Sequence, residues 1–388
     1  MYKKQKKINT LIGEEPIEKW NATDRKKEVI VNKERFLAFL DDLLNLSNLN
    51  EIKIKIYNIR GVIANSKSDK IGLLNITANG DTMRVNHSFL QSEIEQILET
   101  HTIERTKYYI RRLKKSLSEV KTGKINDLNL NKWKEYEDII TDSLWVLGKR
   151  DNSGAHTGDY WGNFIPQIPN QLLQRYTKRG EWVLDPFLGS GTTLIECRRL
   201  GRNGIGVELQ EKVAKAAENL IANEINKHKV QTKVIVGDST SLDFKESLRA
   251  AGVETVQFVI MHPPYWDIIK FSDDERDLSR AKGISGFLDM LGRVVDNSYD
   301  ILDRGRYLAL VIGDKYSKGE WIPLGFYCMQ EVMKRGFLLK SVIVKNFDET
   351  KGKMNQKELW RYRALVGGFY VFKHEYIFLF QKSAVCYS

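Results

Sequence analysis

The second half of the chain alternates short apolar runs with longer amphipathic stretches. Short apolar runs bounded by Gly, Pro or acidic residues are typical of buried parallel strands. In the stretches between these runs, apolar residues recur at the spacing of a helix. The strands expected from these runs are Trp182–Leu184, Gly204–Glu208, Lys233–Asp238, Val256–Met261 and Tyr307–Ile312, with a helix expected over 211–227. Two later runs, Leu338–Val344 and Tyr376–Phe380, are expected to close the sheet as an antiparallel pair. This pattern predicts an α/β fold with a doubly wound sheet and an antiparallel last strand.

The first half of the chain has a different pattern, which predicts an α+β extension. Residues 1 to about 30 are polar and rich in lysine, with Trp20 as their large apolar anchor, and we expect an arm there. A helix is expected from Val31, a strand over Glu51–Ile56, short strands within 57–85 and helix again over Ser88–Val120. No internal repeat is evident. The character of the sequence changes near Trp145, so we expect an N-terminal region over 1–145 and a second domain over 146–388.

Composition and charge narrow the classes of function. The chain has 388 residues, of which 42% are hydrophobic and 29% charged, with a net charge of +11 that favours a polyanionic partner such as nucleic acid. No apolar run reaches the length of a membrane span, and no apolar segment follows the basic start as in a secretion signal. Three widely spaced cysteines give no zinc or disulfide pattern, which fits the cytoplasm.

Basic residues gather with two tyrosines in the segment 105–124. A solvated basic helix is one interpretation, and contact with DNA phosphates is the other. The second gains weight only if other motifs indicate a DNA substrate. The candidates for phosphate contact are Arg105, Lys107, Arg111, Arg112, Lys114 and Lys115.

The stretch Trp182–Glu196, W-V-L-D-P-F-L-G-S-G-T-T-L-I-E, combines a strand, a glycine turn and a helix start. Pro186 blocks the strand, two glycines permit a tight turn, and Thr192 and Thr193 are expected to cap the helix. Such a turn brings backbone N–H groups against a small polar ligand. It is not a P-loop, because no Lys follows the second Gly.

Polar residues stand where four predicted strands end, at Asp185, Glu208, Asp238 and His262. Ligands of parallel sheets bind at the carboxyl ends of the strands, so these side chains are expected at one site. Glu208 lies 23 positions after Asp185, close to where nucleotide folds place the carboxylate that accepts hydrogen bonds from ribose hydroxyls.

The sequence D-P-F-x-G-S-G-T-T resembles motif I of DNA methyltransferases that modify adenine N6 or cytosine N4. The resemblance implies a Rossmann-like class I fold and S-adenosyl-L-methionine as cofactor. It assigns Glu208 to the ribose, Asp238 with Ser239 to the adenine, and Asp185 to the cofactor's ammonium and the loop amides. The full set of expected cofactor-binding residues is Asp185, Pro186, Phe187, Gly189, Gly191, Thr192, Thr193, Glu208, Asp238 and Ser239.

The sequence His262-Pro263-Pro264-Tyr265 resembles motif IV of the same family, usually D-P-P-Y, N-P-P-Y or S-P-P-Y. An exocyclic amino nitrogen is a poor nucleophile because its lone pair is delocalised into the ring. The resemblance implies that the first side chain and the carbonyl of Pro263 accept its two hydrogens, and that Tyr265 stacks on the extruded base. All four residues are therefore candidate catalytic residues.

The first position departs from the family pattern, because it is His. A neutral imidazole has one acceptor nitrogen, whereas a protonated one only donates. We therefore expect activity to fall at acid pH as His262 titrates, near its reference pKa of about 6.5 if that is unperturbed. His also leaves adenine and cytosine equally open as the target base.

Other parts of the family pattern match loosely. The stretch Trp145–Tyr176 resembles motif X, which closes over the methionine end of the cofactor, although a domain linker is a rival interpretation. Target recognition is expected within 1–145, helped by a loop over Asp348–Tyr370, and Phe271–Ser279 is expected to order around the base. No cysteine nucleophile motif, nuclease site or metal site is evident.

The sequence thus predicts a site-specific DNA amino-methyltransferase of restriction-modification or phage defence. Its expected partners are double-stranded DNA and a cognate restriction endonuclease, with the oligomeric state open. Two alternatives stay open at this point: an RNA guanine-N2 methyltransferase, which uses a similar loop, and a non-catalytic nucleic-acid-binding subunit on the same scaffold.

Overall fold

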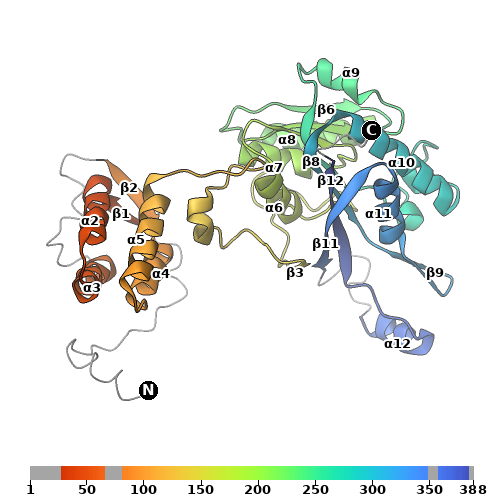
Figure 1. The fold of residues 1–388 in the computed structure, drawn as a ribbon. Helices are drawn as coiled ribbons and strands as arrows, with labels where there is room; N and C mark the ends of the chain where they lie inside the picture. Colours follow the sequence, from red (N-terminus) through yellow and green to blue (C-terminus); the bar gives the residue numbers. More distant parts are fainter. Residues whose placement is uncertain (1–27, 66–80, 348–356, 384–388) are drawn as a thin grey trace. The chain divides into compact units, whose positions relative to one another are not determined.

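The chain divides into two compact units in its structure, a computed structural model that describes residues 28–65, 81–347 and 357–383. The smaller unit is Met1–Lys121 with Asn129–Glu137, and the larger is Thr122–Leu128 with Asp138–Ser388 (Figure 1). The boundary expected at residue 145 falls a few residues beyond this division. Trp20 and the rest of the expected arm up to residue 27 lie outside the described residues.

The smaller unit packs helices on a two-stranded antiparallel ribbon around a hydrophobic core of its own. The helix expected from Val31 is present but begins at Lys33, because residues 28–32, which include the end of the expected arm, form a strand. The helical pattern over Ser88–Val120 is confirmed as two helices. Its elements are β1 (Glu28–Asn32), α2 (Lys33–Asn45), α3 (Leu49–Asn65), β2 (Thr82–Asn86), α4 (His87–Leu98), α5 (Ile103–Ser118) and the 3-10 helix η2 (Leu130–Glu135).

The strand expected over Glu51–Ile56 is wrong, because this segment belongs to α3. The alternation of charged and apolar residues there is part of a longer helical pattern, in which Ile52, Ile56 and Ile59 are buried and Ile54 is exposed. Of the short strands expected within 57–85, residues 57–65 continue α3, and 82–85 belong to β2. Residues 66–80 lie outside the described part of the chain.

The structure shows an internal repeat that is not evident in the sequence. The order strand–helix–helix of β1, α2 and α3 recurs as β2, α4 and α5, 54 residues later from Glu28 to Thr82. Both copies begin the first helix at an Asn, Asn32 or Asn86, whose side chain accepts a backbone N–H three residues on. The two copies share few identical residues, so the repeat lies in the burial pattern more than in the sequence.

The larger unit is built on an eight-stranded sheet of order β3-β11-β12-β8-β7-β4-β5-β6. Strands β6, β5, β4, β7 and β8 are parallel neighbours, and β12 lies antiparallel between β8 and β11. This topology confirms the α/β fold, with its doubly wound sheet and antiparallel last strand. The strands are β3 (Leu144–Trp145), β4 (Trp182–Asp185), β5 (Asn203–Glu208), β6 (Thr232–Val236), β7 (Val256–Met261), β8 (Leu302–Ile312), β11 (Phe337–Asn346) and β12 (His374–Lys382).

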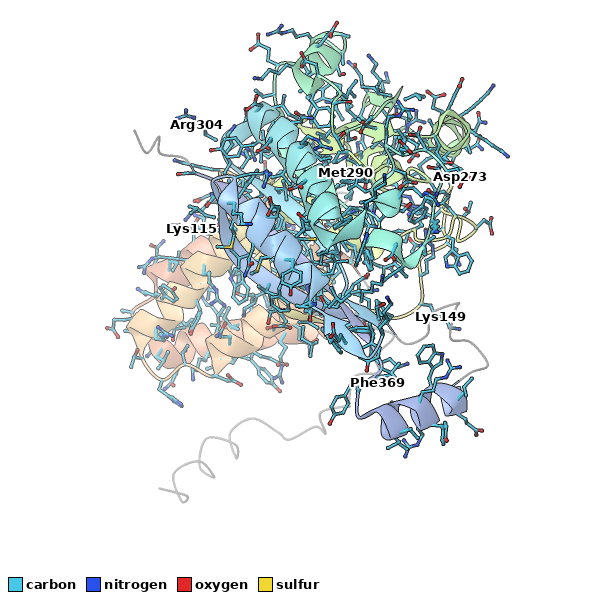
Figure 2. The ribbon with its side chains drawn as sticks, turned by 90° about the vertical axis from the view of Figure 1, so that its right-hand side faces the viewer. Lys115, Lys149, Asp273, Met290, Arg304 and Phe369 are labelled. Carbon is cyan, nitrogen blue, oxygen red and sulfur yellow. The ribbon has the colours of Figure 1, made fainter. Side chains whose placement is uncertain are left out.

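Helices cover both faces of this sheet. Apolar side chains of α9, α10 and α11 pack on one face, and those of α6 and α7 pack on the other. Figure 2 shows α10, with Met290 labelled, and α11 side by side. The helices are α6 (Gln167–Tyr176), α7 (Thr192–Leu200), α8 (Glu211–Asn223), α9 (Phe244–Arg249), α10 (Gly283–Ile301), α11 (Leu324–Lys334) and α12 (Lys357–Gly367), with 3-10 turns η3 (Trp266–Ile268) and η4 (Leu278–Arg280). A separate hairpin joins β9 (Lys315–Ser317) to β10 (Glu320–Ile322).

Because the five neighbouring strands from β6 to β8 are parallel, their carboxyl ends meet at one edge of the sheet. The predicted residues Asp185, Glu208, Asp238 and His262 stand at or just beyond four of these ends. The fold therefore brings together chemistry that the sequence spreads over nearly eighty residues, from Asp185 to His262.

Candidate active site

The turn between β4 and α7 has the tight backbone that its glycines predict. Gly189 and Gly191 have φ angles of 54° and 87°, in the left-handed region that favours glycine. A Cβ on Gly189 would lie 3.1 Å from the ring of Tyr160, and one on Gly191 would lie 3.0 Å from Ile221. A side chain at either position would therefore be strained by the backbone conformation and crowded by its neighbour.

The expected capping by Thr192 and Thr193 is wrong. Gly191 is the N-cap of α7 and makes no side-chain cap, and both threonines lie inside the helix. Their hydroxyls instead donate outside the helix, Thr193 to Asp185 at the end of β4 at 2.6 Å and Thr192 to Asn163 at 2.7 Å. Asp185 is buried and needs donors, which explains why Thr193 turns toward it.

Asp185 lies beneath the glycine turn and holds it. Its carboxylate accepts the Phe187 N–H at 3.0 Å as well as the Thr193 hydroxyl. Burial raises the pKa of Asp185 to about 6, and the nearby Glu208 adds to the shift. The contact with loop groups expected for Asp185 is present, but Asp185 does not line the neighbouring cavity.

A cavity of about 940 Å³ extends along the carboxyl edge of the sheet. Such a volume suits a cofactor together with a planar base, since small-molecule sites have volumes of about 300 to 1,000 Å³. The glycine turn borders it, and so does the segment after β7. The predicted residues that line it are Pro186, Phe187, Gly189, Thr192, Glu208, Asp238, Ser239, His262, Pro263, Pro264 and Tyr265, whereas Asp185, Gly191 and Thr193 do not.

Glu208 presents a carboxylate at the cavity wall. One oxygen accepts the Gly189 N–H and the other the Gln210 N–H, each at 3.0 Å. Burial raises the pKa of Glu208 above its ordinary value. Each oxygen keeps a further lone pair, so the group can still accept hydrogen bonds from a vicinal diol.

The loop after β6 is tied to the glycine turn. The Ser239 hydroxyl donates to the Pro186 carbonyl at 2.7 Å, and the Asn297 amide donates to the Ser239 carbonyl at 2.9 Å. Asp238 accepts from the backbone N–H and the hydroxyl of Thr240, at 2.9 Å each. The Ser239 hydroxyl therefore binds the glycine turn, and this contact positions Asp238 at the cavity wall.

Three lining residues, Tyr160, Asn163 and Phe271, are not among the individual site residues that the sequence predicts. Asn163 donates to Ser190 at 2.6 Å and accepts from Thr192, which fastens its loop to the glycine turn. The rings of Tyr160 and Phe271 stack with centroids 6.2 Å apart. The glycine-rich loop within Trp145–Tyr176 is evident in the sequence, but no local signal distinguishes Tyr160 and Asn163 from their neighbours.

The His262 ring lies at the other part of the cavity wall, between two aromatic rings. Its centroid is 4.8 Å from that of Phe164 and 5.6 Å from that of Tyr265, both at steep interplanar angles. Burial lowers the pKa of His262 to about 4, and Lys345 adds to this shift while Glu375 opposes it. The imidazole is therefore neutral at physiological pH.

A chain of hydrogen bonds leads from His262 to a buried ion pair. The Tyr265 hydroxyl donates to Glu375 at 2.7 Å, and Glu375 also accepts from the Lys345 ammonium at 3.0 Å. Lys345 and Glu375 come from β11 and β12 and are 5% and 7% exposed, so their charges depend on each other.

This chain determines which nitrogen of His262 carries the proton. The Tyr265 hydroxyl spends its hydrogen on Glu375, so at its 3.3 Å contact with His262 Nε2 it can only accept. Nε2 therefore carries the proton, and Nδ1 keeps a free lone pair. Within the described residues the ring makes no other hydrogen bond, so Nδ1 is available to a ligand.

All six predicted phosphate contacts lie on α5, and three of them bind side chains of the smaller unit. Arg112 binds the buried Glu93 through two nitrogens, Lys114 binds Asp41 at 2.5 Å, and Arg105 donates to Tyr109. The other three, Lys107, Arg111 and Lys115, make no ion pair with any residue that the structure describes.

Membrane spans and metal clusters are both missing from the described ranges. No helix there is long and apolar enough to cross a membrane. No group of three or more His, Cys, Asp or Glu side chains is arranged there to hold a metal ion. The described cysteines, Cys197 and Cys328, are buried and unpaired with each other.

Comparison with known proteins gives a family match over most of the chain. The N6/N4 methyltransferase family model, described as DNA methylase, matches residues 2–219 and 256–387. The type II methyltransferase M.MjaII of Methanocaldococcus jannaschii is 46% identical over 50 residues, which are 13% of this chain and 9% of that protein. M2.DpnII of Streptococcus pneumoniae is 35% identical over 99 residues, 24% of this chain and 34% of the relative.

A third relative, M.MthZI of Methanothermobacter thermautotrophicus, is also a type II methyltransferase. It is 43% identical over 96 residues, which are 25% of each chain. The matches thus span about a third or less of the length of these three relatives.

Proposed function

Because the chain belongs to the N6/N4 DNA methylase family, we propose that it moves a methyl group from S-adenosylmethionine to an exocyclic amino nitrogen of adenine or cytosine in duplex DNA. The supporting observation is the cavity along the sheet edge, which the glycine turn after β4 and His262–Tyr265 after β7 both line. A methyl donor and an extruded base can therefore meet in one cavity.

The residues at the glycine turn fit the cofactor. Glu208 offers carboxylate lone pairs to the ribose hydroxyls, and Asp238 at the next strand end faces the same space. Tyr160 and Phe271 give the wall an apolar surface, and Asn163 keeps the loop of Tyr160 in place. When bound, S-adenosylmethionine supplies an electrophilic methyl carbon on a sulfonium sulfur.

The residues after β7 fit the target base. His262 Nδ1 accepts a hydrogen bond from one amino hydrogen and the Pro263 carbonyl accepts one from the other, which localises the lone pair on the amino nitrogen. The methyl–sulfur bond breaks as the nitrogen–methyl bond forms, and the methylated nitrogen then loses one proton to water. Tyr265 lies where it can pack against the base, with its hydroxyl held by Glu375. Positioning and preorganised acceptors thus carry the reaction.

The wider role rests on the kind of relative that the chain resembles. We extend the proposal to restriction-modification or phage defence in the cytoplasm, with a cognate restriction endonuclease as partner and DNA contact by the region 1–145. The match to a DNA methylase model does not favour the RNA guanine-N2 alternative.

The decisive experiment measures methyl transfer from radiolabelled S-adenosylmethionine to duplex DNA and, in parallel, to tRNA. We expect labelled DNA, and mass spectrometry of the nucleosides then distinguishes N6-methyladenine from N4-methylcytosine. His262→Ala should lower the rate by roughly 10²-fold, as the loss of one positioned hydrogen-bonding group does in other enzymes.

His262→Asn is the matched variant, because its amide oxygen restores an acceptor. It should keep more activity than His262→Ala. Labelling of tRNA alone would replace the proposal with an RNA substrate. Labelling of neither nucleic acid, with the cofactor bound, would favour a non-catalytic subunit.

A further inference from the structure

The ribbon of the smaller unit has a local two-fold axis. Its strands pair antiparallel with Glu28 opposite Asn86, Ile30 opposite Arg84 and Asn32 opposite Thr82. In the repeat of 54 residues, Ile30 and Arg84 occupy equivalent positions, and they face each other at the centre. Equivalent residues meet at the centre of a pair only when a two-fold axis passes between them.

The helices obey the same symmetry. Helix α2 packs against α5, and its equivalent α4 packs against α3, so each copy is completed by the other. The second helix of each copy also starts at an equivalent cap: the side chain of Asn48 or Thr102 accepts the N–H three residues on. Buried equivalents are Val31 and Val85, Leu40 and Ile94, Ile56 and Ile110, and Ile59 and Leu113.

The two faces of the ribbon differ in burial. Val31 and Val85 point into the core, where they are 0% and 1% exposed. The alternate positions on the outer face are exposed, namely Glu28, Ile30, Thr82 and Arg84. Within the described residues, an exposed Arg84–Glu28 ion pair of 3.4 Å is the polar contact that these side chains make. Such a pair contributes little stability and is readily exchanged for another partner.

We propose that this outer face enters the major groove of duplex DNA and reads base edges there. A two-stranded ribbon fits that groove, which is about 12 Å wide. The side-chain types match groove chemistry, because Arg pairs with guanine, Ile contacts the thymine methyl, and Thr and Glu bond to base edges. Arg111 and Lys115 of the same unit make no ion pair with any described residue, and they supply positive charge for DNA phosphates.

The symmetry has a consequence for the sequence that is read. The backbone of the ribbon is two-fold, but its outer side chains are not, since Ile30 faces Arg84 and Glu28 is equivalent to Thr82. The two half-sites therefore present different groups, and the recognised sequence should be non-palindromic. The inference rests on the proposed function for its duplex substrate, and it names the element that selects the sequence.

The first test maps methylated bases in the genome of a methylation-free bacterial host that produces the full chain. Arg84→Ala should lower discrimination at one position of the motif by about tenfold or more, with an unchanged melting temperature. Arg111→Ala is the control, an exposed arginine on α5, which should weaken binding evenly and leave the motif intact. A motif that Arg84→Ala does not alter would overturn the inference.

A second test does not depend on methyl transfer. Ile30→p-benzoylphenylalanine in the full chain is photo-cross-linked to random-sequence duplex DNA, with Val120→p-benzoylphenylalanine as the control. Both positions are exposed aliphatic residues of the smaller unit, at 40% and 81%, and Val120 lies outside the ribbon. We expect at least about tenfold more cross-linking from position 30, and little to duplex RNA, whose major groove is too narrow for side chains.

The outcomes separate the two proposals. Cross-linking at position 30 without methylated DNA would keep the ribbon and reject the proposed reaction. Methylated DNA without preferential cross-linking at position 30 would reject the ribbon and keep the reaction. Cross-links from position 30 to the chain itself or to a second copy would show that the face is covered by protein, and would also overturn the inference.

Discussion

At the scale of single residues, the surroundings of His262 change what its residue type implies. A histidine with the reference pKa of about 6.5 would be partly protonated near neutrality. Burial lowers the pKa of His262 to about 4, so the imidazole remains an acceptor where Asp, Asn or Ser acts in the family pattern. The lowered pKa of His262 thus moves the expected loss of activity from near pH 6.5 to near pH 4.

The corrected prediction concerns pH. The methyl-transfer rate should stay constant from about pH 8 to about pH 5 and fall as His262 protonates near pH 4. Single-turnover rates across this range test it, with His262→Asn as the control that lacks the titrating ring. A decline centred near pH 6.5 in the native chain, absent from His262→Asn, would contradict the lowered pKa.

The same pKa predicts how stability changes with acidity. Between the folded pKa of about 4 and the unfolded value of about 6.5, the unfolded chain binds more protons at His262. The stability that the neutral His262 ring contributes to the folded state is therefore fully present above pH 6.5 and is lost as the pH falls toward 4.

The hydrogen-bond chain behind His262 gives a second prediction. In Glu375→Gln, the Lys345 ammonium requires an acceptor and should hold the amide oxygen, which turns the amide N–H₂ toward Tyr265. The Tyr265 hydroxyl would then donate to His262 Nε2, and the proton would move to Nδ1. We expect kcat to fall by roughly 10²-fold with little change in KM.

The ¹⁵N chemical shifts of the His262 ring identify the tautomer directly. Because Glu375→Gln leaves a buried ammonium without its carboxylate, the melting temperature is measured alongside. The double variant Glu375→Gln/Lys345→Met is the control, since its amide is free to turn back and should recover part of kcat. An unchanged Nε2–H tautomer in folded Glu375→Gln would refute the relay.

At the scale of elements, the turn between β4 and α7 is fixed by hydrogen bonds to its neighbours in the fold. Asp185 and Thr193 hold the loop from below, and the Gly189 N–H is bonded to Glu208. Little of the turn is free to adjust, so its shape is set before any ligand binds. A helix with a glycine N-cap also leaves its first N–H groups without a side-chain cap.

Two glycine variants distinguish the effect of crowding in the turn from the effect of backbone strain alone. Gly189→Ala and Gly180→Ala both place a side chain at positive φ, 54° and 79°, and each should cost about 1 to 2 kcal/mol of stability. Only the Cβ on Gly189 meets a neighbour, Tyr160 at 3.1 Å. Calorimetry should show about tenfold weaker S-adenosylmethionine binding for Gly189→Ala alone. Equal affinities of the two variants would count against the turn as the cofactor site.

At the scale of the whole molecule, the two compact units have different chemistry. Every residue that lines the cavity belongs to the larger unit, and the basic cluster of α5 belongs to the smaller. Aromatic pairs gather near the cavity in the larger unit, where Tyr316 stacks on Phe369 and Trp321 contacts Phe372. Figure 2 labels Phe369 at the end of α12, in the part of the expected recognition loop that the structure describes. Residues 348–356 of that loop lie outside the described part of the chain.

The different surroundings of Arg111 and Arg112 on α5 lead to a prediction about the salt dependence of DNA binding. Arg111 is exposed and unpaired among the described residues, whereas its neighbour Arg112 is bound to the buried Glu93. Arg111→Ala should reduce the slope of log K for DNA against log salt by about 1. Arg112→Ala should lower the melting temperature and leave that slope nearly unchanged. Fluorescence anisotropy at several salt concentrations measures both, and equal slopes for Arg111→Ala and the native chain would exclude a phosphate contact there.

The larger unit could be predicted well from sequence because its signals are local. A buried parallel strand has to be a short apolar run, and the residue that ends it stands at the carboxyl edge. Asp185, Glu208, Asp238 and His262 could therefore be assigned to one edge of the sheet from the order of residues alone. The smaller unit was harder to predict. In the segment Glu51–Ile56 the alternating lysines imitate a strand, and only the burial of Ile59 and Ile63 further along shows a helix.

The tertiary structure alone decided the features that depend on residues far apart in the chain. Glu375 and Lys345 reach Tyr265 through the pairing of β11, β12 and β8, and the protonation and tautomer of His262 follow from that contact and from desolvation. The two-fold ribbon of Ile30 and Arg84 is equally non-local, because a repeat kept in burial and backbone pairing leaves few matching letters. Covalent order determines which chemical groups a chain carries, but three-dimensional neighbours and the exclusion of water determine their charge and their partners.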